Sequence, residues 1–222
     1  SYYIICETNS LSGDKIQFKM TLKIKISKKL ISYKAAILFL KKRVDLLKNG
    51  KNEDLLWILE HPLTYTSGIR SNKNEILDNR IKIIKTNRGG KITLHNPGQK
   101  VIYLAIDLNH KKKDIRNLIN LIELSIIEFL SLYKIKAKAD KKNIGIWVKK
   151  KKIAAIGLRI TKWIAYHGCS ININNNLEHY KKIVPCGLDN TKITSVKKES
   201  NIKILNINKK LKNIFIKNLK NI

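Results

Sequence analysis

Three stretches of the chain repeat apolar residues at the three- and four-residue steps that place side chains on one face of a helix. They are residues 33–48, 115–133 and 207–219. The first stretch is followed by Asn49 and Gly50, which are typical of a helix C-terminus. We therefore predict three amphipathic helices at these positions.

Other stretches are short, apolar and rich in β-branched or aromatic residues, which favours buried strands. They are residues 55–59, 81–86, 101–108, 144–148, 153–160 and 163–174. The last three follow one another with lysines between them, which predicts an antiparallel meander. Strands and helices alternate irregularly, so we predict an α/β or α+β fold in which helices pack on one face of a sheet.

The chain of 222 residues, 43% of them apolar, is long enough for one domain with a continuous core. Its beginning is harder to interpret, because it starts with Ser1 and its only methionine is Met20. We expect residues 1–19 to be an N-terminal extension outside the core, with Met20 as a natural start. Residues 20–222 then form a single domain.

No apolar run approaches the roughly 20 residues that a membrane-spanning helix requires. The first ten residues also lack the basic-then-apolar order of a secretory signal. Three cysteines without CxxC spacing argue against a disulfide framework and against a zinc site. We expect a cytoplasmic protein with reduced thiols, no metal site and no contact with membranes.

The formal net charge is +30, from 46 basic and 16 acidic residues. Such an excess often indicates binding to nucleic acid. Here lysine occurs beside Ile and Asn throughout the chain, and arginine, the better partner for phosphates and guanine edges, is scarce. We therefore expect no nucleic-acid partner, whereas attraction to an acidic protein remains open.

Two cysteines have contrasting sequence contexts. Cys186 lies between Pro185 and Gly187, where a tight turn could direct backbone amides at a reactive sulfur, although an inert loop cysteine fits equally well. Cys169 alternates in phase with Ile171, so we expect it to be a small apolar side chain in the core.

The sequence RGGKITLHNPGQ at residues 88–99 combines Arg88, two glycines and His95. Consecutive glycines let a ligand approach the backbone closely, and an arginine can hold an anion or pin a loop. A Gly-Gly hairpin turn between two strands with a structural histidine is the alternative.

Five blocks in this order resemble the lipoyl(octanoyl) transferase family, across residues 33–196. They are EHPLTYTSG (60–68), RGGKITLHNPGQ (88–99), KIAAIG (152–157), HGCSIN (167–172) and PCG (185–187). The resemblance implies the fold of biotin and lipoate protein ligases, with a mixed, largely antiparallel sheet and helices packed against it. Residues 20–222 would then be the catalytic domain.

The resemblance also implies an activity. A member of this family moves an octanoyl group from octanoyl-acyl carrier protein to a lysine of lipoyl domains, in 2-oxoacid dehydrogenases and in the glycine cleavage H protein, without a cofactor. Cys186 matches the nucleophile that forms a thioester, and Lys152 matches the lysine that lowers the pKa of its thiol. The residues that match the lining of the acyl pocket are Arg88, Gly89, Gly90, Lys91, Ile92, Thr93, Leu94, His95, Ala155, Ile156, Gly157, Gly168, Cys169 and Ser170.

The sequence departs from the family pattern within its second block. Asn96 stands where glycine is usual, and Leu94 stands where an aromatic residue is common. These positions put the shape of the pocket in doubt, and with it the preferred chain length. His95 and His167 are possible helpers in catalysis.

The nearest alternative function is an ATP-dependent lipoate or biotin ligase of the same fold. Ligases use longer glycine and arginine runs than Arg-Gly-Gly and do not need a cysteine in the PCG block. A cysteine hydrolase that uses Cys186 with a histidine, and a protein that binds nucleic acid, are further alternatives.

Overall fold

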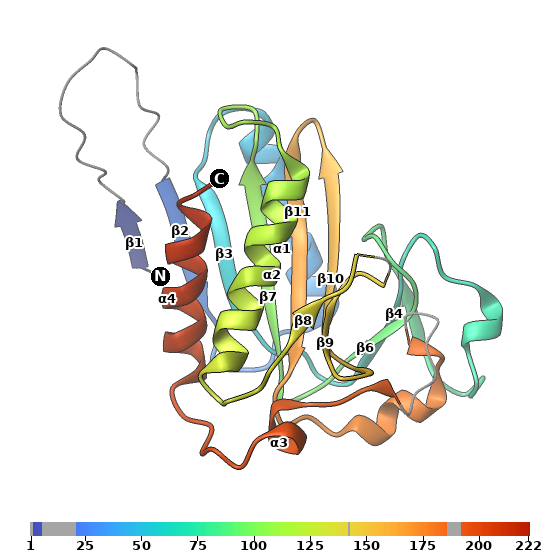
Figure 1. Cartoon of the computed structure of the whole chain (residues 1–222). Coiled ribbons are helices and arrows are strands. Elements are labelled where there is room, and N and C mark those ends of the chain that lie inside the picture. The colour runs from blue at the N-terminus through green and yellow to red at the C-terminus, as the bar shows by residue number, and fades with distance from the viewer. Residues whose placement is uncertain (1, 6–20, 142, 186–191) are drawn as a thin grey trace.

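The structure is a computed structural model that describes residues 2–5, 21–141, 143–185 and 192–222. Within these residues the larger of two sheets has eight strands, and all neighbouring pairs are antiparallel except the parallel pair β2 and β3. In spatial order the strands are β1 (Tyr2–Ile5), β2 (Thr21–Ile26), β3 (Asp54–Leu59), β7 (Gln99–Asp107), β11 (Ile164–Asn172), β10 (Lys151–Thr161), β9 (Ile146–Val148) and β8 (Lys138–Ala139) (Figure 1).

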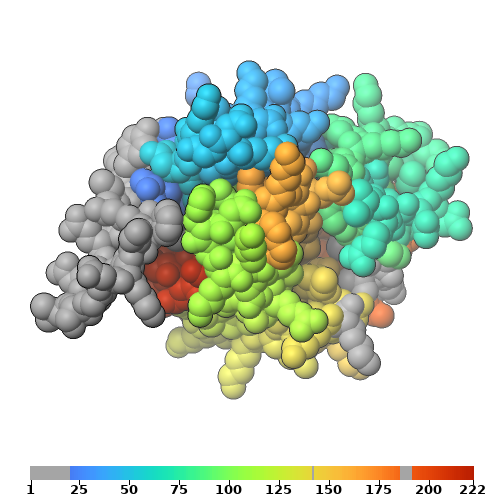
Figure 2. All heavy atoms as spheres, turned by 90° about the horizontal axis from the view of Figure 1, so that it is seen from above, coloured from blue at the N-terminus to red at the C-terminus, as the bar shows by residue number. Residues whose placement is uncertain are grey.

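A smaller sheet of three strands stands beside the first, in the order β5 (Ile83–Lys85), β4 (Thr64–Ser67) and β6 (Thr93–His95). Two short 3₁₀ helices accompany it, η1 (Lys73–Glu75) and η2 (Leu177–Lys182). Tyr65, Tyr180 and Ile183 form a separate small core there with other apolar residues. In the space-filling view the segment around η1 and β5, coloured teal, lies beside the orange turn of the β10–β11 hairpin (Figure 2).

Helices cover both faces of the larger sheet. Helix α1 (Tyr33–Lys48) packs on one face, and α2 (Ile115–Ser131) and α4 (Ile207–Leu219) pack together on the other, while α3 (Val196–Glu199) is a single turn. The prediction that helices pack on one face was therefore wrong. Strand β3 gives the physical reason, because all six of its residues are buried and such a strand needs cover on both sides.

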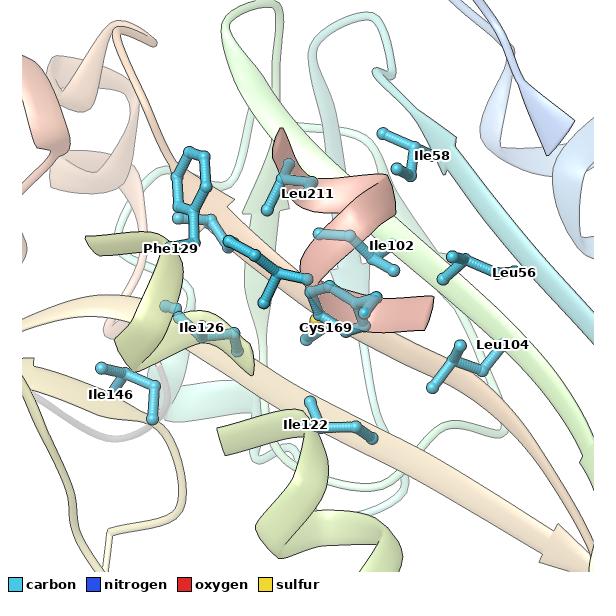
Figure 3. Close-up of a cluster of buried hydrophobic side chains, with 14 of the residues drawn as sticks. Leu56, Ile58, Ile102, Leu104, Ile122, Ile126, Phe129, Ile146, Cys169 and Leu211 are labelled. Atoms are coloured by element: carbon cyan, nitrogen blue, oxygen red, sulfur yellow. The ribbon is translucent and has the colours of Figure 1, made fainter. Parts of the chain in front are cut away.

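Alternate residues of the central strands divide the core into two layers. Leu55 and Trp57 of β3 pack with Leu40 of α1, whereas Leu56 and Ile58 face α2 and α4. Figure 3 shows the second layer, in which Ile122, Ile126 and Phe129 of α2 and Leu211 of α4 lie over the sheet. This packing holds strands β7, β11 and β10 in fixed register, which positions the site described below.

The predicted helices are confirmed, and two of them have the predicted bounds. Helix α1 begins after Ser32, whose hydroxyl accepts a hydrogen bond from the Ala35 amide, and the chain leaves the helix through Gly50 at φ +63°. Helix α2 ends at Ser131, two residues before the predicted end. The predicted meander is confirmed as β9, β10 and β11.

Strands β1, β2, β4, β6 and β8 were not predicted. Strand β2 alternates apolar residues with lysines over only six residues, and the other four are shorter still. Strand β1 forms the edge of the larger sheet by pairing with β2 from Tyr2–Ile24 to Ile5–Thr21. The division into an extension and a catalytic domain stays a prediction.

None of the helices in the described residues is long and apolar enough to span a membrane.

Candidate active site

A cavity of about 250 Å³ lies between the β10–β11 hairpin and the loop that joins β5 to β6. It brings together three of the blocks singled out in the sequence. The predicted residues that line it are Arg88, Gly89, Gly90, Lys91, Thr93, His95, Lys152, Ala155, Ile156, Gly157, Gly168, Cys169 and Ser170. Their roles in binding or catalysis stay predictions.

Ile92 and Leu94 do not line this cavity, which corrects the predicted lining at two positions. Strand β6 alternates its side chains, so Thr93 and His95 face the cavity while Leu94 points into the small core with Tyr65. Asn96 is also buried away from it. Its amide donates to the Asn176 carbonyl and accepts from Asn175, so this residue shapes the loop at 174–176.

Lys152 has a buried side chain, only 6% exposed, whereas the neighbouring Lys149, Lys150 and Lys151 are exposed. Its Nζ donates a hydrogen bond to the Ile144 carbonyl over 2.8 Å and lies 5.6 Å from the centre of the Trp147 ring. The described residues place no carboxylate within salt-bridge distance of this ammonium group. A buried lysine without a counter-ion is costly, so such a group is a candidate for function.

Two backbone features make room for the Lys152 side chain. The pairing of β10 with β9 shifts register between Lys152 and Ala154, and such a bulge can redirect a side chain. Gly145, at φ +142°, faces the lysine across this pair. A Cβ atom at Gly145 would lie 2.4 Å from the Lys152 Cε and 3.0 Å from its Nζ.

Cys186 lies outside the described residues. The chain on both sides of its segment runs next to Lys152. Pro185 borders a small second cavity together with Lys152 and Ile193. Ile193 forms a bridge with Lys152, and the Thr194 amide donates to the Lys152 carbonyl over 3.0 Å.

Arg88 is buried and pins the glycine loop onto strand β4. Its guanidinium donates to the Thr66 carbonyl and hydroxyl oxygens, each at 2.9 Å, and to the Gly89 carbonyl at 3.0 Å. The glycine loop and the chain after β4 approach each other closely, because a Cβ atom at Gly68 would lie 2.3 Å from the Gly90 carbonyl oxygen. Strands β5 and β6 both pair with β4 and not with each other, so the alternative of a Gly-Gly hairpin turn was wrong.

The rings of Tyr33, His95 and Tyr103 line the cavity from separate elements, and the fully buried His61 packs behind them. Tyr33 stacks on His95 with ring centres 5.7 Å apart, and His61 packs edge-on against His95 at 5.4 Å. The His61 Nδ1 lies 2.6 Å from the Ile31 carbonyl, which can only accept, so Nε2 accepts from the Tyr103 hydroxyl at 2.9 Å. Sequence reasoning missed Tyr33 and Tyr103, because a helix start and a buried strand carry no signal of a site.

The three histidines at this end are held neutral. Burial lowers the pKa of His61 to about 4 and, together with Arg88 and other nearby cations, that of His167 to about 3. Burial also lowers the pKa of His95 well below its ordinary value, and its Nδ1 donates to Gln99 Oε1 at 2.8 Å. At neutral pH these rings offer apolar faces and hydrogen-bonding edges rather than charge.

Cys169 packs in the core under α2 and α4, as predicted (Figure 3). Its side chain is buried, and this burial raises the pKa of the thiol. Cys169 is therefore an unreactive thiol beside the cavity, and it is not a candidate for the nucleophile. The described residues contain no cluster of three or more potential metal-binding side chains.

A family model described as lipoyl protein ligase A/B catalytic domain matches residues 33–216. The octanoyltransferase of Wolbachia sp. subsp. Brugia malayi (strain TRS) is 40% identical over 177 residues, which cover 78% of this chain and 86% of that protein. The octanoyltransferase of Ehrlichia chaffeensis is 43% identical over 180 residues, with 78% and 84% covered.

Solved structures resemble this chain in fold. A chain in the structure of a bipartite lipoate protein ligase and its E2 lipoyl domain from Thermoplasma acidophilum has a TM-score of 0.65 at 14% identity, with 88% of this chain and 83% of that chain covered. Lipoate-protein ligase A bound with ATP has a TM-score of 0.64 at 15% identity, with 76% and 74% covered. At these identities the likeness concerns the fold alone, and it confirms the predicted fold class.

Proposed function

Because the chain belongs to the lipoyl protein ligase A/B catalytic domain family, we propose that it moves an octanoyl group from an acyl carrier protein to a lysine of a lipoyl-accepting domain. Its octanoyltransferase relatives, which are about 40% identical, support this reaction. The structural observation that carries the proposal is the burial and the position of the Lys152 side chain. This buried cation without a carboxylate partner in the described part of the chain lies beside both ends of the segment that contains Cys186.

In the first step, the Cys186 thiolate attacks the carbonyl carbon of the octanoyl thioester on the carrier protein. The bond from that carbon to the carrier sulfur breaks, and the carrier leaves as a thiol after taking a proton from the Lys152 ammonium. One thioester replaces another, so the step needs no ATP. The Lys152 ammonium stabilises the thiolate, because a nearby positive charge favours the ionised thiol.

In the second step, the amine of the acceptor lysine attacks the octanoyl-Cys186 thioester. An amide forms, the carbon–sulfur bond to Cys186 breaks, and the amine loses a proton to the thiolate or to a neutral Lys152. The amide is more stable than the thioester, so transfer proceeds toward product. The acceptors are the lipoyl domains of 2-oxoacid dehydrogenases and the glycine cleavage H protein, and the protein acts in the cytoplasm.

The alternative of an ATP-dependent ligase has weaker support. The solved ligases share the fold at 14–15% identity, whereas the curated octanoyltransferases are 40–43% identical. The two functions differ in their need for ATP, which a direct assay resolves. A hydrolase that uses Cys186 would instead release the free acid.

The test incubates the whole protein with octanoyl carrier protein in the absence of ATP and follows its intact mass. We expect the mass of the protein to increase by one octanoyl group. The protein loses this group only after a lipoyl domain is added, and the mass of the lipoyl domain then increases by the same amount. Cys186→Ala abolishes the increase, whereas Cys169→Ala, which removes the buried thiol, keeps it. Acylation that requires ATP, or that persists in Cys186→Ala, contradicts the proposal.

A further inference from the structure

Residues 134–151, which run from just after α2 to the start of β10, are rich in lysine even for this chain. They contain eight lysines and a single acidic residue, Asp140. Across the whole chain, 46 of 222 residues are basic and 16 are acidic. Lysine is therefore denser in this segment than basic residues are in the chain as a whole, and the overall composition does not account for the excess.

The lysines of β8 lie on the face of the larger sheet that carries Lys152. The apolar residues of this segment that pack in the core under α2 are Ile135, Ala137 and Ala139. Side chains alternate along a strand, so Lys136 and Lys138 point to the opposite face. Lys138 pairs with Trp147, and Trp147 pairs with Lys152 (Figure 1). Paired residues share a face, so Lys138 lies on the Lys152 side of the sheet, two strands or about 10 Å away.

The turn between β9 and β10 adds two more lysines directly before Lys152. Together the four residues form a surface that we name the lysine edge, which consists of Lys136, Lys138, Lys149 and Lys150. All four are exposed, and none forms an ion pair with a carboxylate in the described part of the chain. Lys151 is not part of this surface, because it pairs with Val148, which packs in the core under α2.

The lysine edge lies beside the mouth of the cavity. Asn143 and Ile144, in the turn between β8 and β9, line the cavity and are exposed. The Ile144 carbonyl also accepts the hydrogen bond from Lys152. The cavity of about 250 Å³ has room for an acyl group and none for a protein. The body of a protein that delivers an acyl group to Lys152 must therefore rest on the surface around this turn.

We propose that the lysine edge binds an acidic face of the acyl carrier protein during the first step. This inference rests on the proposed octanoyl transfer. Acyl carrier proteins are acidic, so the unpaired ammonium groups attract the carrier and orient it at the mouth. These groups are exposed and lie about 10 Å from Lys152, so they accelerate capture of the carrier without taking part in the chemical step.

The test follows acylation of the whole protein by octanoyl carrier protein through its intact mass, at limiting and at saturating carrier. The double variant Lys136→Glu/Lys138→Glu reverses two charges of the lysine edge. At low ionic strength we expect its second-order rate constant to fall at least about tenfold, whereas its rate at saturating carrier stays within about twofold of the wild type. At about 1 M salt, where the screening length is about 3 Å, the difference from the wild type disappears.

The matched control is Lys112→Glu/Lys162→Glu, which changes the net charge equally at the opposite end of β10. Lys162 directly follows this strand of 11 residues, which places it about 30 Å from Lys152. Lys112, in the loop after β7, lies at the same end of the sheet and is also exposed. We expect the control to keep its second-order rate constant within about threefold of the wild type. Lys136→Arg/Lys138→Arg preserves the charges and should keep the wild-type value.

Equal second-order rate constants for the two glutamate variants overturn the inference, because charge would then act through the molecule as a whole. A slower rate at saturating carrier, or a difference that persists at high salt, also overturns it, because the replacements would then disturb Lys152 or the fold. If acylation is unchanged and only transfer to a lipoyl domain slows, the lysine edge binds the acceptor and the inference is wrong. If the carrier does not acylate the wild-type protein at all, the proposed transfer itself has failed.

Discussion

Lys152 and Ile144 are joined by a hydrogen bond from the lysine Nζ to the carbonyl oxygen of Ile144, 2.8 Å long. Ile144 lies in the turn before β9, and Lys152 lies near the start of β10, so the bond crosses a β-hairpin and holds the ammonium at the cavity. An ammonium group has three donors, and this bond uses one of them. The other two remain for a thiolate, a thioester or an incoming amine.

Replacing Lys152 by methionine should therefore remove the reaction while keeping the shape of the side chain. We expect single-turnover acylation by octanoyl carrier protein to slow at least about 100-fold, the usual scale for losing a charge that assists proton transfer. Lys151→Met changes the exposed neighbour on the same strand and should leave the rate within about twofold. Equal rates for the two variants would exclude Lys152 from the chemistry.

Gly145 provides a second test of the lysine position without changing the lysine. A Cβ atom there would lie 2.4 Å from Lys152 Cε and 2.7 Å from the Ala154 carbonyl oxygen, so Gly145→Ala must displace the side chain or the strand. We expect at least about a tenfold loss of acylation rate, because small displacements of a catalytic group are costly.

The matched control for this change is Gly50→Ala. Gly50 also has positive φ, but a Cβ atom there would have no neighbour within 4 Å. Its replacement should lower the free energy of unfolding by about 1 kcal/mol and leave the acylation rate unchanged. If Gly145→Ala were acylated at the wild-type rate, the reaction would not depend on the present position of the Lys152 side chain.

The sequence predicted the elements with strong periodicity. It also singled out three blocks with glycines and basic residues that line one cavity in the structure, although the roles of these residues stay predictions. It could not predict how Tyr33, His61 and Tyr103 come together. These residues lie in a helix start, a turn and a strand whose middle is apolar, and the order of strands β3, β7 and β11 brings them together. The packing of helices on both faces was not predicted, although β3 is apolar over nearly its whole length.

The error at Leu94 has a similar origin. Block matching assigned every residue between Arg88 and His95 to the cavity, whereas strand β6 must send alternate side chains to opposite faces. Likewise, the left-handed conformation of His167 has no counterpart in the sequence pattern. His167 stacks on the adjacent Tyr166 ring and pairs with the distant Asn87, and this second contact cannot be seen in the sequence.

A variant that lacks residues 1–19 should fold and transfer octanoyl groups at a rate within about twofold of the full chain. Strand β1 lies at the far edge of the larger sheet, with β2, β3 and β7 between it and β11. Its removal exposes the β2 edge, so we expect more self-association at high concentration, which sedimentation would detect.

A deletion of residues 207–222 is the control at the other end of the chain. It removes α4, whose Leu211, Phe215 and Leu219 are fully buried against the α2 layer, so this variant should not yield soluble protein. An inactive but folded variant lacking 1–19 would show that the N-terminal residues contribute to the site, and would reject their description as an extension.

Acid should destabilise the protein through His61. Burial holds its pKa at about 4, compared with 6.5 for an unperturbed histidine. Between these values the unfolded chain binds more protons than the folded one, so stability is complete above pH 6.5 and is lost as the pH falls toward 4. Protonation of His61 would also remove the lone pair that accepts from Tyr103. The contribution between pH 7 and pH 4.5 is about 2 kcal/mol.

Urea unfolding of the wild type and of His61→Gln at pH 7.0, 5.5 and 4.5 isolates this contribution, because glutamine does not titrate. We expect the free energy of unfolding of the variant to decrease by about 2 kcal/mol less than that of the wild type over this range. If His61→Gln follows the wild-type curve, His61 does not stay neutral in the folded protein, and the hydrogen bond from Tyr103 cannot depend on its lone pair.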